Sequence, residues 1–150
     1  GDMDGIRSTL DSNYYGTLAM IRAFAPILAR NGGGAILNVL SAVAWTPVEG
    51  NTAYAAAKSA QGGLTNGVRI ELAAQGTQVS ALVPGLIGTQ TLFDFAERHG
   101  IEFADGVVMD PADLVRLALD GLEAGEIEIL DAMAVEAKAS LAGPPRAFAL

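Results

Sequence analysis

The stretch from Ser41 to Lys58 reads Ser-Ala-Val-Ala-Trp-Thr-Pro-Val-Glu-Gly-Asn-Thr-Ala-Tyr-Ala-Ala-Ala-Lys. Tyr54 and Lys58 stand four residues apart, about one helical turn, so a helix here places both side chains on one face. Because a nearby cation favours a phenolate, we expect the pKa of Tyr54 to fall below its ordinary value. Tyr54 would then exchange protons with an alcohol or a carbonyl, while Ser41, thirteen residues upstream, holds the substrate oxygen.

The residues around this stretch predict alternating helices and strands. Apolar residues at 3–4 spacing predict a helix over 7–30, which a run of glycines ends, and a continuous apolar run predicts a buried strand over 35–40. The further expected elements are a helix over 52–74, a strand over 78–83, a loop over 84–109 with a short helix at 92–98, a helix over 111–124, a strand over 126–130 and a helix over 131–141. This order predicts an α/β fold, in which three parallel strands with flanking helices form a single domain over residues 1–150.

Two further motifs accompany the serine, tyrosine and lysine. Asn13 lies 28 residues before Ser41 in a helical segment, and Pro84-Gly85-Leu86-Ile87-Gly88-Thr89 follows the second predicted strand. Together these features resemble the short-chain dehydrogenase/reductase family, whose signature is Tyr-x-x-x-Lys with an upstream serine. The Pro-Gly segment looks like the family's loop that closes on the nicotinamide. The resemblance covers almost the whole chain but only the C-terminal half of the family's fold.

The resemblance implies an NAD(P)-dependent oxidoreductase that interconverts a secondary alcohol and a ketone by hydride transfer. It makes Tyr54 the acid/base and Ser41 the group that positions the substrate oxygen. Lys58 would lower the pKa of Tyr54 and hold the ribose hydroxyls, and Asn13 would hold a water in a proton relay. The candidate catalytic residues are Asn13, Ser41, Tyr54 and Lys58, and the candidate cofactor-binding residues are Tyr54, Lys58, Pro84, Gly85, Ile87 and Thr89.

One part of the family's pattern is missing. No Gly-x-x-x-Gly-x-Gly or Gly-x-Gly-x-x-Gly follows a predicted strand, and no residue that selects NAD or NADP is readable. We therefore expect a partial Rossmann-like, doubly wound parallel sheet without the N-terminal nucleotide-binding half, in a fragment of a longer protein. The alternative function is a truncated, non-catalytic interaction or dimerisation module.

Association is expected at two surfaces. The strand over 35–40 would have an exposed edge, which favours dimerisation, strand swapping or aggregation. The resemblance also implies a homo-oligomer formed through the 7–30 and 52–74 helices. Gly62 and Gly63, inside the second of these helices, are expected to allow close packing on another helix.

Composition restricts the remaining classes of function. A net charge of −8 disfavours nucleic-acid partners, and the absence of an unbroken apolar run of 18 residues predicts no membrane span. The lack of cysteine fits a cytoplasmic protein. With His99 as the single histidine, expected in a loop, neither a histidine-cluster metal site nor a Ser-His-Asp triad is expected, and no Gly-x-Ser-x-Gly indicates a serine hydrolase. Trp45 and Phe93 are candidates for lining the substrate pocket.

Overall fold

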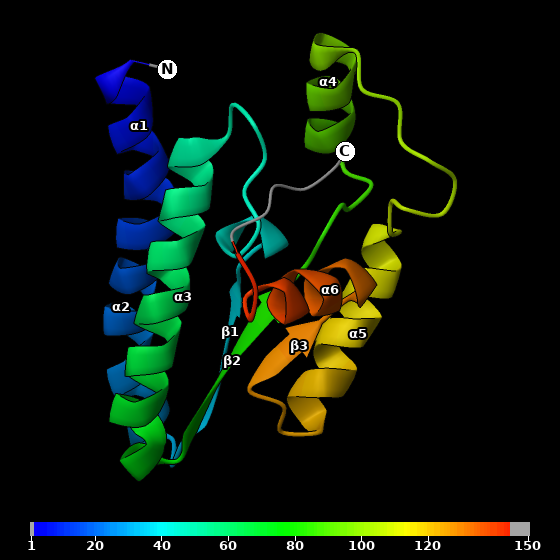
Figure 1. Cartoon of the computed structure of the whole chain (residues 1–150). Helices are drawn as coiled ribbons and strands as arrows, with labels where there is room; N and C mark the ends of the chain where they lie inside the picture. The colour runs from blue at the N-terminus through cyan, green and yellow to red at the C-terminus, as the bar shows by residue number, and fades with distance from the viewer. Residues whose placement is uncertain (1, 145–150) are drawn as a thin grey trace.

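Three strands and the helices around them make up the described part of the chain (Figure 1). The computed structural model describes residues 2–144, so residue 1 and residues 145–150 of the expected domain lie outside it. The elements are α1 (Met3–Leu10), a π-helical turn (Asp11–Tyr15), α2 (Gly16–Arg30), β1 (Gly34–Val39), α3 (Thr52–Leu72), β2 (Thr77–Val83), α4 (Gln90–His99), α5 (Pro111–Glu123), β3 (Glu128–Leu130) and α6 (Ala132–Ser140). Short 3-10 turns, Ala42–Ala44 and Ala73–Gln75, follow β1 and α3. None of these helices has the length and apolar character needed to span a membrane.

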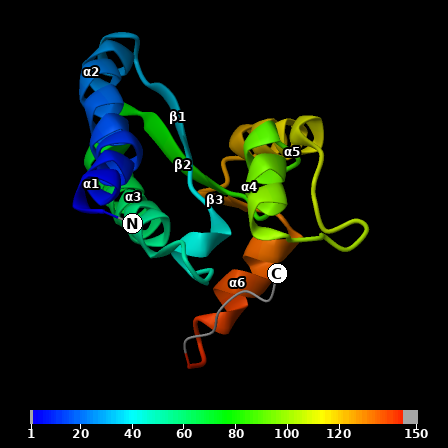
Figure 2. The same ribbon diagram turned by 90° about the horizontal axis from the view of Figure 1, so that it is seen from above.

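The sheet is parallel throughout, with strand order β1-β2-β3. Asn38 of β1 pairs with Ala81 of β2, and Leu82 of β2 pairs with Ile129 of β3. Helices α2 and α3 lie on one side of the sheet and α5 lies on the other, as Figures 1 and 2 show. The predicted α/β fold, a three-stranded parallel sheet flanked by helices, is therefore confirmed.

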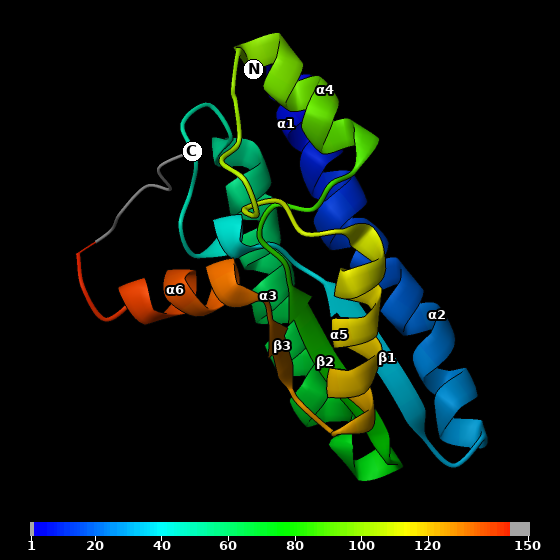
Figure 3. The same ribbon diagram turned by 90° about the vertical axis from the view of Figure 1, so that its right-hand side faces the viewer.

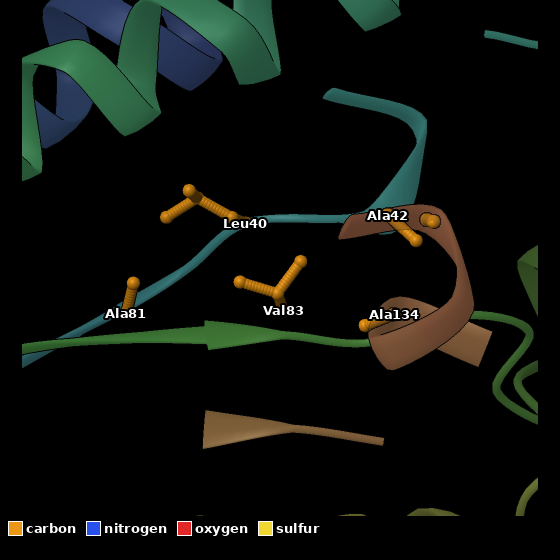
Figure 4. Close-up of a cluster of buried hydrophobic side chains, with 6 residues drawn as sticks. Leu40, Ala42, Ala81, Val83 and Ala134 are labelled. Carbon is orange, nitrogen blue, oxygen red and sulfur yellow. The ribbon is translucent and has the colours of Figure 1, made fainter. Parts of the chain in front are cut away.

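The core divides between the two faces of the sheet because successive strand side chains point to opposite faces. Val79 packs with α2 and α3, whereas Leu82 packs with α5. A third cluster lies near the carboxyl end of β2, under α6 (Figure 4); its buried members are Leu40, Ala42, Ala81, Val83, Ala134 and Ala137. These clusters fix the carboxyl ends of β1 and β2 against the helices.

The predicted helix over 7–30 differs from the structure in two ways. It begins at Met3, because the Asp2 carboxylate accepts a hydrogen bond from the Gly5 amide at 2.7 Å and caps the first turn. The π-helical turn Asp11–Tyr15 then interrupts it, with the Gly16 amide bonded to the Asp11 carbonyl. Apolar spacing of three to four residues does not reveal such a local change in hydrogen bonding.

The short helix in the long loop is also longer than predicted. Helix α4 covers Gln90–His99 because the Thr89 hydroxyl caps its first turn, and Gly100, at a φ of 65°, ends it. His99 therefore lies in the last helical turn and not in a loop, with its ring stacked on Phe95.

The glycine pair of α3 packs differently from the prediction. A Cβ on Gly62 would lie 3.2 Å from Leu40 Cδ2, so this close contact is with the segment after β1 and not with another helix. A Cβ on Gly63 or Gly67 would meet no atom within 4 Å. The outer face of α3 is thus open in the described chain.

The outer edge of β1 is exposed as well. Within residues 2–144 β1 pairs with β2 alone, and Val39 keeps 47% of its surface accessible. A groove of about 640 Å³ lies between α2 and this strand, with Phe24, Leu28 and Ile36 among its lining residues. The edge expected from the sequence is therefore present and apolar.

Candidate active site

The candidate site lies where the carboxyl ends of β1 and β2 meet the first turns of α3. Ser41 follows β1 and Pro84 follows β2 directly. The Leu40 amide donates to the Leu82 carbonyl and the Ala42 amide donates to the Pro84 carbonyl, each at 2.8 Å, so pairing continues beyond the strands. Ser41 is thereby held beside the Pro84 loop, at the sheet edge where α/β proteins bind ligands.

Tyr54 and Lys58 enter the site from α3. The helix begins at Thr52, which places Tyr54 in its first turn and Lys58 one turn later. Lys58 is 7% exposed, and its Nζ donates to the Val39 carbonyl at 2.8 Å and to Gln61 Oε1 at 3.0 Å. The ammonium also lies 5.6 Å from the centroid of the Tyr54 ring. The predicted shared helix face is therefore present.

One cavity of about 680 Å³ joins these residues. All the candidate catalytic and cofactor-binding residues line this cavity: Asn13, Ser41, Tyr54, Lys58, Pro84, Gly85, Ile87 and Thr89. They come from the π-helical turn, the ends of two strands and the start of α3. Their placement together is observed, while their chemical roles stay predictions.

The predicted acidic Tyr54 is wrong for this chain. Burial raises the pKa of Tyr54 above its ordinary value, and hydrogen bonding to Ser41 lowers it by less. Burial likewise lowers the pKa of Lys58. Desolvation is the cause, and it exceeds any effect of the nearby cation: the ammonium of Lys58 hydrogen-bonds to the Val39 carbonyl and to Gln61, and it lies over the Tyr54 ring.

Asn13 reaches the cavity from the π-helical turn. Its amide donates to the Thr9 carbonyl at 3.0 Å and to Ser12 Oγ at 3.2 Å. Its backbone carbonyl accepts a hydrogen bond from Thr17 Oγ1 at 2.8 Å. π-helical turns are frequent at functional sites, and this one sets the orientation of Asn13. The water-holding role stays a prediction.

A buried carboxylate that sequence reasoning missed anchors the Pro84–Thr89 loop. Asp131, 6% exposed, accepts from the Gly85 amide at 2.6 Å and from the Ala134 amide at 2.8 Å. A Cβ on Gly85 would lie 2.7 Å from Met133, so the close approach requires glycine. The sequence signal was an aspartate just before a helix, which indicates an N-cap, whereas Asp131 was included in the predicted helix over 131–141.

The apolar wall of the cavity also differs from the prediction. Phe95 of α4 and Phe103 line it, but Trp45 and Phe93 do not. Trp45 instead packs against the third core cluster, beneath Lys138. Phe93 is 48% exposed, because the helical repeat of α4 turns Phe95 inward in its place.

Gln61 of α3 is a second polar group that sequence reasoning missed as a site residue. It is 5% exposed, and its amide joins Lys58 to Thr17. A polar residue in an otherwise apolar helix stripe was the available signal.

Comparisons with known proteins agree with this geometry. A family model described as short chain dehydrogenase matches residues 1–99. An uncharacterised oxidoreductase from Staphylococcus epidermidis is 35% identical over 104 residues, covering 66% of this chain and 45% of the relative. An NADPH-dependent 1-acyldihydroxyacetone phosphate reductase from Schizosaccharomyces pombe is 40% identical over 90 residues, covering 60% and 29%. The chain thus spans half or less of the length of these relatives.

Solved structures show the same likeness over nearly the whole chain. A short chain dehydrogenase from Burkholderia cenocepacia, in complex with NADP, superposes with a TM-score of 0.82 at 34% identity, over 95% of this chain and 58% of that one. A short-chain dehydrogenase from Sphingobium yanoikuyae, in complex with NADPH, gives 0.74 at 26% identity, over 100% and 61%. With the family model matching well over half of its residues, the chain belongs to the short-chain dehydrogenase family.

Proposed function

We propose that this chain carries the catalytic residues of an NAD(P)-dependent oxidoreductase that interconverts a secondary alcohol and a ketone. The proposal rests on one observation: Asn13, Ser41, Tyr54 and Lys58 all line the same cavity. Family membership and the NADP and NADPH held by two structural neighbours support a nicotinamide cofactor.

The residues of the cavity fit the nicotinamide half of such a cofactor. The site has about 680 Å³ at the carboxyl ends of two parallel strands, beside a loop held by Asp131. Pro84, Gly85, Ile87 and Thr89 would face the nicotinamide, and Tyr54 with Lys58 would hold the ribose hydroxyls. A bound nicotinamide supplies or accepts the hydride.

Residues of this chain would hold the substrate oxygen and transfer the proton to it. In carbonyl reduction Ser41 holds that oxygen and Tyr54 transfers its phenolic proton to it. The raised pKa of Tyr54 keeps the phenol protonated at neutral pH, which suits the acid needed for reduction. Lys58, over the ring, would stabilise the phenolate left behind.

The cavity favours an uncharged substrate. Among the described residues, Lys58 is the only charged side chain that lines it, and the outer wall includes Leu92, Phe95 and Phe103. A phosphate or carboxylate on the substrate would lose its water without gaining a charged partner other than Lys58. We therefore expect apolar ketones to react in preference to anionic ones.

Cofactor titration tests the proposal at the level of this chain. NADH and NADPH are titrated against the 150 residues by calorimetry, and neutral and carboxylated ketones are then offered with the cofactor that binds. Saturable binding, with cofactor oxidation that depends on a neutral ketone, is the expected result. Absence of both would refute the proposal for this chain.

One observation favours the non-catalytic module as the second candidate. The exposed edge of β1 and the apolar groove beside α2 form a surface suited to another chain. Concentration-dependent self-association without cofactor binding is the result that this alternative expects.

A further inference from the structure

Gln61 links two parts of the site that are distant in sequence. Its side chain lies on the sheet-facing side of α3 and is 5% exposed. Oε1 accepts from Lys58 Nζ at 3.0 Å, and Nε2 donates to Thr17 Oγ1 at 2.9 Å. A buried amide needs such partners, and both of them come from groups beside the candidate active site.

The donors and acceptors in the series from Lys58 through Gln61 and Thr17 to Asn13 are determined by which groups carry protons. The ammonium of Lys58 has donors only, so the amide oxygen of Gln61 must face it. The amide nitrogen therefore faces Thr17 and requires its hydroxyl to accept. The Thr17 proton is then free to reach the Asn13 carbonyl, 2.8 Å away. The donors run from Lys58 to Asn13 without reversal.

This direction favours a positive charge on Lys58. Hydrogen bonds that all point the same way polarise one another, and this series of hydrogen bonds starts at the ammonium of Lys58 and ends on the Asn13 carbonyl. The Val39 carbonyl is the other acceptor of the ammonium. Burial acts in the opposite sense and lowers the pKa of Lys58. Among the described residues lining the cavity, Tyr54 is the only other titratable side chain.

We propose that Gln61 is a positioning residue for Lys58: its amide, anchored by Thr17, holds the ammonium over the Tyr54 ring and keeps it charged. The consequence for turnover rests on the proposed function, whereas the coupling of Gln61 to Lys58 does not.

Only two lysines occur in the chain, Lys58 and Lys138, so an NMR titration of the lysine side-chain carbons reads Lys58 directly, with Lys138 as internal reference. In Gln61→Leu the pKa of Lys58 falls by about one to two units, because a charge-assisted bond is lost. In the nearly isosteric Gln61→Glu the carboxylate raises the pKa of Lys58.

Gln75→Leu is the matched control. Its amide also bridges two elements, donating to the Ala25 carbonyl at 3.1 Å and to Thr77 Oγ1 at 2.8 Å, but it lies in the 3-10 turn that follows α3, away from the candidate site. This variant leaves the pKa of Lys58 unchanged. If Gln61→Leu does not fold, Gln61→Glu and Thr17→Val decide, the latter lowering the pKa of Lys58 by less than the loss of the amide.

A pKa of Lys58 that is the same in the Gln61 variants as in the parent chain overturns the inference. If cofactor-dependent turnover is found, its pH profile shifts in the same direction as the pKa of Lys58 in each variant. If the protein turns over substrate but the pKa of Lys58 is unaffected by the Gln61 substitutions, this inference is rejected and the proposed function stands. A responsive Lys58 in a chain that binds no cofactor rejects the proposed function alone.

Discussion

Tyr54 and Lys58 show how burial outweighs proximity at the scale of a residue. Four residues on a helix bring the two groups together, yet desolvation sets the direction of both pKa shifts. The ammonium hydrogen-bonds to the Val39 carbonyl and to Gln61, while burial of the phenol raises the pKa of Tyr54. The phenol of Tyr54 therefore keeps its proton at neutral pH.

The first prediction concerns the titration of that phenol. Tyrosinate absorbance should show one of the three tyrosines ionising above pH 10.0, and Tyr54→Phe should remove this component. Above 10.0 the folded chain holds a proton that the unfolded chain has lost, so the contribution of Tyr54 to the free energy of unfolding falls as pH rises further. The lowered pKa of Lys58 makes the free energy of unfolding rise with pH below 10.5, opposite to the effect of Tyr54. The contribution of Tyr54 is therefore isolated by comparing the parent chain with Tyr54→Phe. A Tyr54 component below pH 10 would contradict the assignment.

The second prediction concerns Asp131, whose carboxylate serves both a helix cap and the Gly85 amide. Asp131→Ala should lower the free energy of unfolding by about 2–3 kcal/mol, because a cap is lost and a buried amide loses its acceptor. Asp110→Ala is the control, since Asp110 caps α5 in the same way but is exposed. Equal losses in urea unfolding would show that the Gly85 bond contributes nothing.

At the scale of an element, helix α3 has one side packed on the segment after β1 and one side open. Its sheet-facing side meets Leu40 through Gly62, whereas Gly63 faces open space. We predict that Gly63→Ala stabilises the monomer by about 1 kcal/mol through helix propensity. Gly62→Ala should gain less, because its Cβ would press on Leu40 at 3.2 Å. Chemical unfolding of both variants tests this, and a larger gain at Gly62 would contradict the packing.

The elements themselves were largely predictable from the sequence. Apolar runs and 3–4 spacing located the strands and helices, because burial of a face leaves a periodic trace. The π-helical turn left no such trace, and the cap at Asp2 extended the first helix beyond its periodic part. The candidate site residues were predicted together because Tyr54 and Lys58 are one helical turn apart, and because their spacing with Ser41, Asn13 and the Pro84–Thr89 loop resembles the family's pattern. Gln61, Asp131 and Phe103 were missed as site residues, because their partners lie on other elements.

At the scale of the whole molecule, residues 2–144 leave two surfaces uncovered: the outer edge of β1 and the outer face of α3. Figure 3 shows β1 and α2 side by side at one margin of the sheet. We predict concentration-dependent association in sedimentation velocity. Ala35→Lys, on the exposed edge, should weaken it if strands pair, and Ile70→Lys, at 78% exposure on α3, should weaken it if helices pair. A monomer at every concentration would contradict both expected surfaces.

The most direct test of the central claim is the turnover number of Tyr54→Phe in NAD(P)H-dependent reduction of a neutral ketone. Removing the phenolic proton should lower kcat about 100-fold or more while the affinity for cofactor stays nearly the same. Tyr15→Phe, an exposed tyrosine outside the cavity, is the control and should retain full activity. An unchanged kcat in Tyr54→Phe, or equal losses in both variants, would contradict Tyr54 as the proton donor.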